Sequence, residues 1–89
     1  MMLTPDTLMQ VSQRELINYA KREFNKRIER VKKAEVYYNN PNTTDADIER
    51  TYGTLIFILE ELSRIGNEIE ELTGEKIDSD IAVNGFKGV

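Results

Sequence analysis

A chain of 89 residues is enough for one small domain, and its core is thin because a short chain buries only a modest fraction of its surface. The composition includes neither cysteine nor histidine, which excludes disulfides, thiolate metal sites, the common zinc ligand sets and the commonest general base. The net charge of −4 conceals two segments of opposite sign, a net of +5 over residues 14–33 and a net of −8 over residues 45–80. Such segments attract each other or attract separate partners.

The N-terminal region offers two helix starts. Thr4 is a suitable cap, followed by Pro5 in the first turn, where the missing N–H of proline costs nothing. A second start falls at Ser12, which begins a capping box with Glu15 three residues later. The pattern predicts a short helix over residues 5–11 and a basic helix over residues 13–39. One continuous helix from Pro5 is the alternative, and the sequence leaves both open.

The basic helix has one apolar face. Its apolar residues recur every three or four positions, at Ile17, Ala20, Phe24, Ile28, Val31, Ala34 and Tyr38. This spacing is typical of a helix that buries a single stripe. Pro41 ends the helix, because it disfavours the helical conformation of Asn40 before it.

An acidic helix is predicted over residues 45–73. Thr44 and Asp47 form its cap, and Gly74 ends it at a position where helices often adopt a left-handed residue. Its apolar stripe consists of Ile48, Tyr52, Leu55, Leu59, Leu62, Ile65, Ile69 and Leu72. Two long helices joined by a short turn predict an antiparallel hairpin, and the opposite charges of the two arms favour that pairing.

The tail over residues 75–89 differs from the helices before it. It contains scattered apolar residues and a strong turn signal at Asn84-Gly85. We expect an irregular tail that docks on another surface. The whole chain, residues 1–89, is therefore predicted to be one all-α domain, a helical hairpin with a short N-terminal helix and this tail.

The acidic helix is apolar on every side at its midsection. The run consists of Leu55, Ile56, Phe57, Ile58 and Leu59, and a two-helix hairpin covers only one of its sides. We expect these five residues to form an oligomer interface, giving a dimer or a larger bundle. The alternative is that the N-terminal helix and the tail fold back over Phe57 within one chain. Gly53 and Gly66 mark places where another backbone comes close.

Cations and aromatic rings share one face of the basic helix, roughly opposite the apolar stripe. The candidate ligand-binding residues on this basic face are Tyr19, Arg22, Lys26, Arg30, Lys33 and Tyr37. Cationic groups hold phosphate, and a tyrosine ring stacks on a base, so the face suits a nucleotide. Two alternatives stay open: contact with the acidic helix of a neighbouring copy, and a solvated face balanced by pairs such as Glu29–Lys33 and Glu23–Arg27. Duplex DNA is not expected as a partner, because the acidic helix repels it.

The remaining clusters favour neither an enzyme nor a metal site. Ser12 and Ser63 have no base partner, and Asp78-Ser79-Asp80 lacks the glycine and the closing glutamate of a calcium loop. The glutamates of residues 60–71 indicate a solvated acidic face. We expect no catalytic residue, cofactor or metal. The longest apolar run, residues 55–59, is too short to span a membrane, so we expect a soluble cytoplasmic protein.

Over residues 12–74 the predicted hairpin resembles, in size and layout, the small helical proteins that phages make to blunt bacterial defences. Some of those proteins are oligomeric hairpins that sequester cyclic nucleotides. The resemblance implies a non-enzymatic inhibitor, encoded by a phage or mobile element, that binds a nucleotide signal or a host protein in the bacterial cytoplasm. Two other functions fit the sequence: a structural or regulatory helical adaptor, and an antitoxin or immunity protein. The latter would block a basic partner with an acidic surface at Glu49, Glu60, Glu68 and Glu71.

Overall fold

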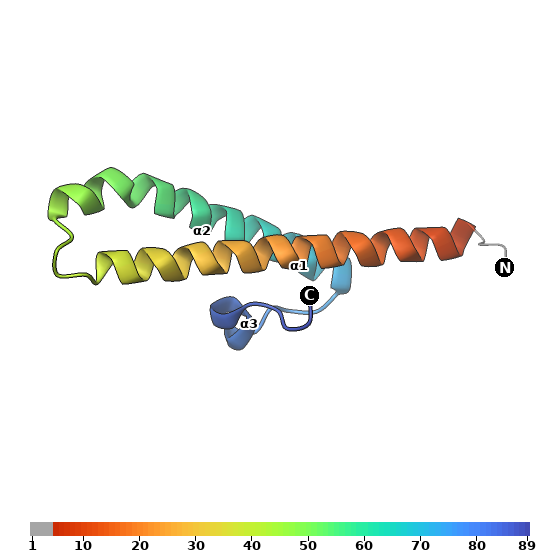
Figure 1. Cartoon of the computed structure of the whole chain (residues 1–89). Helices are drawn as coiled ribbons and strands as arrows, with labels where there is room; N and C mark the ends of the chain where they lie inside the picture. The colour runs from red at the N-terminus through yellow and green to blue at the C-terminus, as the bar shows by residue number, and fades with distance from the viewer. Residues whose placement is uncertain (1–4) are drawn as a thin grey trace.

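The computed structural model describes the backbone of residues 5–89 and the side chains from Ser12 onward. In these residues α1 (Pro5–Tyr38) and α2 (Asp45–Thr73) form an antiparallel hairpin, and the short α3 (Ser79–Asn84) packs against α1 (Figure 1). The predicted all-α hairpin is confirmed. It is a rod of 61 × 22 × 21 Å. Its radius of gyration is 17.2 Å, against about 12 Å for a compact chain of this length.

The first helix is continuous. The separate short helix predicted over residues 5–11 is wrong, and the alternative of one helix from Pro5 is what the chain adopts. No glycine or proline follows Pro5 within this segment, and Ser12 continues the helix at a small cost in propensity instead of starting a new one. The predicted cap at Thr4 lies outside the described residues. The N-terminal part of α1 extends past the end of α2 (Figure 1).

The ends of α2 follow the predicted chemistry. The backbone N–H of Asp47 donates to the Thr44 hydroxyl at 3.2 Å, and the N–H of Thr44 donates back to the Asp47 carboxylate at 3.3 Å. The hydrogen bond from the Thr44 backbone N–H to the carboxylate lowers the pKa of Asp47 below its usual range. At the other end, Gly74 has a φ of +72° and its N–H donates to the carbonyl of Glu70 at 2.8 Å. The predicted bounds of the acidic helix are therefore confirmed.

The core lies where the middle of α1 crosses the C-terminal half of α2. Its buried residues are Ala20, Phe24, Ile28, Ile65 and Ile69, with Leu62, Ile77, Ile81 and Phe86 packed around them. All seven positions of the predicted α1 stripe are buried or half-buried. The predicted α2 stripe needs correction at two positions.

Tyr52 and Leu59 belong to the predicted α2 stripe, yet they are 55% and 42% exposed, whereas Ile58 is only 5% exposed. A helix that keeps one line of contact with a neighbour repeats that contact every 3.5 residues on average, so steps of three and four alternate. From Leu55 the contact line therefore passes through Ile58 to Leu62, and Leu59 falls beside it.

The tail is more ordered than predicted. An irregular conformation is wrong for residues 79–84, which form α3. Asp78 caps this helix, because its carboxylate accepts a hydrogen bond from the N–H of Ile81 at 2.9 Å. The expectation that the tail docks on another surface is confirmed, since Ile77, Ile81 and Phe86 pack on the core.

One side chain of α1 clamps the end of the tail. The Asn25 amide donates to the carbonyl of Phe86 at 2.9 Å, and the N–H of Phe86 donates to Asn25 Oδ1 at 2.7 Å. The Phe86 ring meets Phe24 edge to face, with centroids 5.4 Å apart, and the ammonium of Lys21 lies 5.1 Å from its centroid. Gly85 turns the chain into this clamp with φ +82° and ψ −179°, a conformation that other residues rarely adopt.

We expect Gly85→Ala to lower the free energy of unfolding by about 1–3 kcal/mol, because the backbone there is strained for any other residue. A Cβ at Gly85 would also lie 2.5 Å from Asn25 Oδ1. Urea unfolding followed by circular dichroism measures the change. Gly53→Ala is the matched control: nothing lies within 4 Å of its Cβ position, and alanine should stabilise α2 there by up to about 1 kcal/mol. Unchanged stability of Gly85→Ala would show that the clamp does not form in solution.

Candidate functional site

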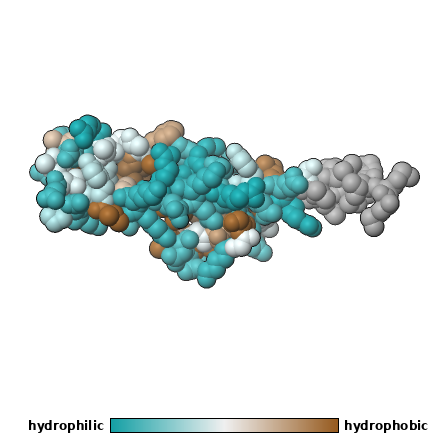
Figure 2. Space-filling view, in the orientation of Figure 1, coloured by the Kyte–Doolittle hydropathy of each residue, from teal (hydrophilic) through white to brown (hydrophobic). Residues whose placement is uncertain are grey.

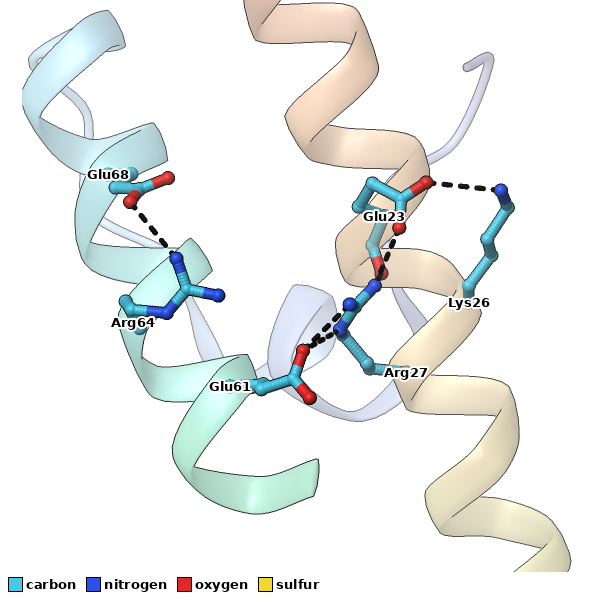
Figure 3. A network of polar contacts seen from close by, with 6 residues as sticks. All are labelled: Glu23, Lys26, Arg27, Glu61, Arg64 and Glu68. Carbon is cyan, nitrogen blue, oxygen red and sulfur yellow. Dashed lines mark hydrogen bonds and ion pairs between the residues drawn. The ribbon is translucent and has the colours of Figure 1, made fainter. Parts of the chain in front are cut away.

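The basic face of α1 is free in the folded chain. The four cations Arg22, Lys26, Arg30 and Lys33 are all exposed, because α2 packs on the opposite side of α1. Figure 3 shows the contrast between neighbours: Lys26 points away from α2, whereas Arg27 points toward it. In the space-filling view, the surface over α1 that faces the reader is largely hydrophilic (Figure 2). The apolar patches in that view lie near the hairpin end and beside α3.

The structure brings the four cations together along one groove. This open groove of about 470 Å³ is lined by Arg22, Asn25, Lys26, Glu29, Arg30, Lys33 and Val89. Val89 reaches it because the tail docks alongside α1, a placement that has no signal in the sequence. Asn25 was also not predicted. An asparagine in the middle of a long helix, where it is a poor helix former, is the one sequence feature that points to it.

The two predicted tyrosines lie outside the groove, one beyond each end. Tyr19 and Tyr37 are 18 residues apart on the same helix, which corresponds to about 27 Å at 1.5 Å per residue. Tyr19 is 57% exposed. Tyr37 meets the ring of Tyr38 edge to face, and Tyr38 in turn hydrogen-bonds Thr51 of α2 at 2.9 Å. A small ligand can therefore contact one of the two rings but not both.

A network of ion pairs joins the edge of this face to α2 (Figure 3). The guanidinium of Arg27 binds one carboxylate oxygen of Glu61 through Nε at 2.9 Å and Nη2 at 2.7 Å, and its Nη1 binds Glu23 at 2.7 Å. Glu23 also accepts from Lys26 at 3.1 Å. The hydrogen bonds from Arg27 and then Lys26 lower the pKa of Glu23, and those to Glu61 and Glu23 raise the pKa of Arg27. The predicted Glu23–Arg27 pair is confirmed.

Three cations of the groove have no carboxylate bound directly to them in the described part of the chain. Among the described residues, Arg22, Arg30 and Lys33 form no ion pair. The predicted Glu29–Lys33 pair is absent from these contacts, so it is wrong for this part of the chain. Glu29 still lines the groove and offsets part of the local charge. The groove thus presents several cationic donors, of which only Lys26 is already paired with a carboxylate.

The predicted oligomer interface is divided among several sides of α2. Ile58 is buried inside the hairpin, Leu55 and Ile56 are half-buried, and Phe57 and Leu59 are exposed. Phe57 is 60% exposed, so the alternative in which the tail folds over it is wrong; the tail docks around Phe24 and Asn25 instead.

The two glycines predicted to mark close approaches behave differently. A Cβ at Gly66 would lie 3.2 Å from Ile77 Cδ1 and 3.5 Å from a ring carbon of Phe24, so the close neighbours there are side chains and the prediction of a nearby backbone is wrong. Nothing lies within 4 Å of the corresponding position at Gly53 in the single chain.

The acidic surface of α2 is also exposed, at Glu49, Glu60, Glu68 and Glu71. Of these four, only Glu68 forms an ion pair among the described residues, with Arg64 at 3.5 Å (Figure 3). The hairpin therefore presents a cationic surface on α1 and an anionic surface on α2.

Neither a metal centre nor a membrane span is found in the part of the chain that the structure describes. No group of three or more carboxylates there is placed to hold a metal ion, and no helix there has the length and apolarity to cross a bilayer.

Comparison with family models, curated proteins and solved structures finds no match to this chain.

Proposed function

We propose that this chain is a non-enzymatic binding protein that takes a phosphate-bearing nucleotide ligand on the basic face of α1. The observation that supports the proposal is the groove in which Arg22, Arg30 and Lys33 form no ion pair among the described residues. In a protein with a net charge of −4, such a local excess of cations is most simply explained by an anionic ligand. We further propose that it is an inhibitor, encoded by a phage or mobile element, that captures a nucleotide signal of a bacterial defence or host system.

The chemistry of the groove suits phosphate. Guanidinium groups bind phosphate oxygens through two parallel N–H donors, and lysine ammonium groups add point charges. The acidic α2 does not cancel this attraction, because it lies on the other side of α1 and physiological salt screens charges over about 8 Å. Tyr19, exposed just before the groove, can stack on a base.

Self-association is the second part of the proposal. The chain exposes 7006 Å² of surface, whereas a compact protein of 10.3 kDa exposes about 5,400 Å². Phe57 and Leu59 are large apolar side chains that the single chain leaves exposed on α2. Burying an aromatic ring of this kind contributes roughly 1.5–3 kcal/mol.

The acidic surface of α2 supports a second candidate function. Glu49, Glu60 and Glu71 are exposed and form no ion pair among the described residues. Such a surface suits a basic protein partner, as in an antitoxin or immunity protein, and charge reversal there would slow association. A structural or regulatory helical adaptor would use the exposed faces of α1 and α2 to bind other proteins without inhibiting them.

We expect calorimetry against a set of cyclic and linear nucleotides to detect binding by the wild type. Arg30→Ala removes one charged contact and should weaken that binding roughly 10- to 150-fold. Arg64→Ala is the control, because Arg64 is an exposed cation of α2 outside the groove. No heat with any nucleotide would contradict the nucleotide proposal and favour the acidic surface as the binding site.

Light scattering of the purified protein should give a mass of at least two chains at micromolar concentration. Phe57→Glu places a charge where we expect an apolar contact and should reduce that mass, whereas Glu60→Lys should leave it unchanged. A monomer of 10.3 kDa for the wild type would contradict self-association.

Expression of the chain in bacteria that carry one of a panel of phage-defence systems should restore plaque formation by a sensitive phage for at least one system. Arg30→Ala should restore it less well, because the captured signal binds more weakly. Absence of any effect across a broad panel would contradict the inhibitor role and favour the adaptor.

A further inference from the structure

The four cations of the groove form a row along one face of α1, within about 80° of one another around the helix. Successive members of the row, Arg22, Lys26, Arg30 and Lys33, are separated by four, four and three residues. At 1.5 Å per residue these steps correspond to about 6, 6 and 4.5 Å along the helix axis, and the row spans roughly 16.5 Å. A compact mononucleotide can reach two neighbouring members of such a row. A ligand with negative charges repeated along a line can reach all four.

The two tyrosines continue the same row at its ends. Tyr19 precedes Arg22 by three residues and Tyr37 follows Lys33 by four, so each lies about one helical turn beyond the cations on the same face. Aromatic rings placed along a cationic track are the usual way in which proteins bind single-stranded nucleic acid without reading its sequence. Rings about 27 Å apart fit separate bases of one extended strand.

The surroundings of the row favour one strand over two. The cations come from a single helix face, and Val89 of the tail closes one side of the groove. A duplex would bring a second phosphate strand that this row does not neutralise, toward a protein whose net charge is −4. A linear polyphosphate offers the same repeated charge but has no base for the tyrosines.

We propose that the basic face of α1 binds an extended segment of single-stranded nucleic acid, with Arg22, Lys26, Arg30 and Lys33 on successive phosphates. Tyr19 and Tyr37 stack on bases at the two ends of the segment. This inference rests on the proposed function, since it uses the same face, and it specifies the ligand as a linear strand in place of a single nucleotide.

The test is fluorescence anisotropy with labelled oligothymidylates of one to eight nucleotides, at several salt concentrations. We expect affinity to rise with length until four phosphates are engaged. For the longer strands log K should fall with log salt with a slope of about −2.8, which is about 0.7 for each phosphate neutralised. Arg30→Ala should make the slope shallower by about 0.7. Lys32→Ala is the matched control: Lys32 is an exposed cation of the same helix, but it lies about 100° from Lys33 and does not line the groove.

A second arm distinguishes bases from bare phosphates. Tyr19→Leu should weaken binding of the longer oligothymidylates about 5- to 150-fold through loss of one stacked base. The same variant should bind inorganic polyphosphate, added as an unlabelled competitor, as well as the wild type does. Because the variant holds the strand less tightly, polyphosphate should displace the strand from Tyr19→Leu at a lower concentration than from the wild type. If the variant binds the strand as tightly as the wild type does, or if the same polyphosphate concentration displaces the strand from both proteins, bases are not recognised and the inference is overturned.

The remaining outcomes separate this inference from the proposed function. Binding of a mononucleotide as tight as that of an eight-nucleotide strand would overturn the linear ligand and leave nucleotide binding intact. Equal losses in Arg30→Ala and Lys32→Ala would also overturn the inference, because they would show attraction to the whole helix and not to the row. Absence of binding at every length, together with silence toward mononucleotides, would overturn both.

Discussion

Two paired helices can bury only the faces that they turn to each other, and this limit shapes the rest of the molecule. The buried residues of α1 and α2 form a single line of contact, so the pairing of the two helices by itself leaves their outer faces and the flanks of the hairpin uncovered. A step of two residues turns a helix by about 200°, so Arg27 and Asn25 lie on opposite flanks. The ion pair with Glu61 closes one flank and the tail covers the other. The cations of the outer face of α1 are left to solvent or to a ligand.

The sequence predicts those features that depend on a few adjacent residues. Thr44 and Asp47 form the predicted cap because the side chain of each satisfies the backbone N–H of the other, and no distant contact is needed. Gly74 ends α2 because it adopts a left-handed conformation at no steric cost. The α1 stripe is predicted well for a similar reason: its apolar residues already lie on one side of the helix. The four cations of the groove follow from the same helical geometry.

The incorrect or missing predictions concern residues whose local sequence suits two conformations equally well, and residues whose contact partner is distant in the sequence. Ser12 serves as a cap or as an interior residue, and the continuity of the surrounding helix decides between them. Ile58 and Leu59 are equally apolar, and only the line of contact with α1 buries the first. The hydrogen bonds between Asn25 and Phe86 join residues 61 positions apart, so no pattern of neighbouring residues predicts them. Val89, a lining residue of the candidate groove that was not predicted, depends on this remote contact, because the contact holds the tail against α1.

The 61 positions between Asn25 and Phe86 also affect the order in which parts of the chain are expected to fold. The two helices and the turn between them form from contacts near in sequence, whereas the clamp must close a loop of 61 residues and needs α1 already in place. We therefore expect residues 75–89 to dock late in folding and to be released early in unfolding. We expect the segment to open as a unit while the hairpin persists. Opening would uncover part of the Phe24 ring and remove Val89 from the side of the basic groove.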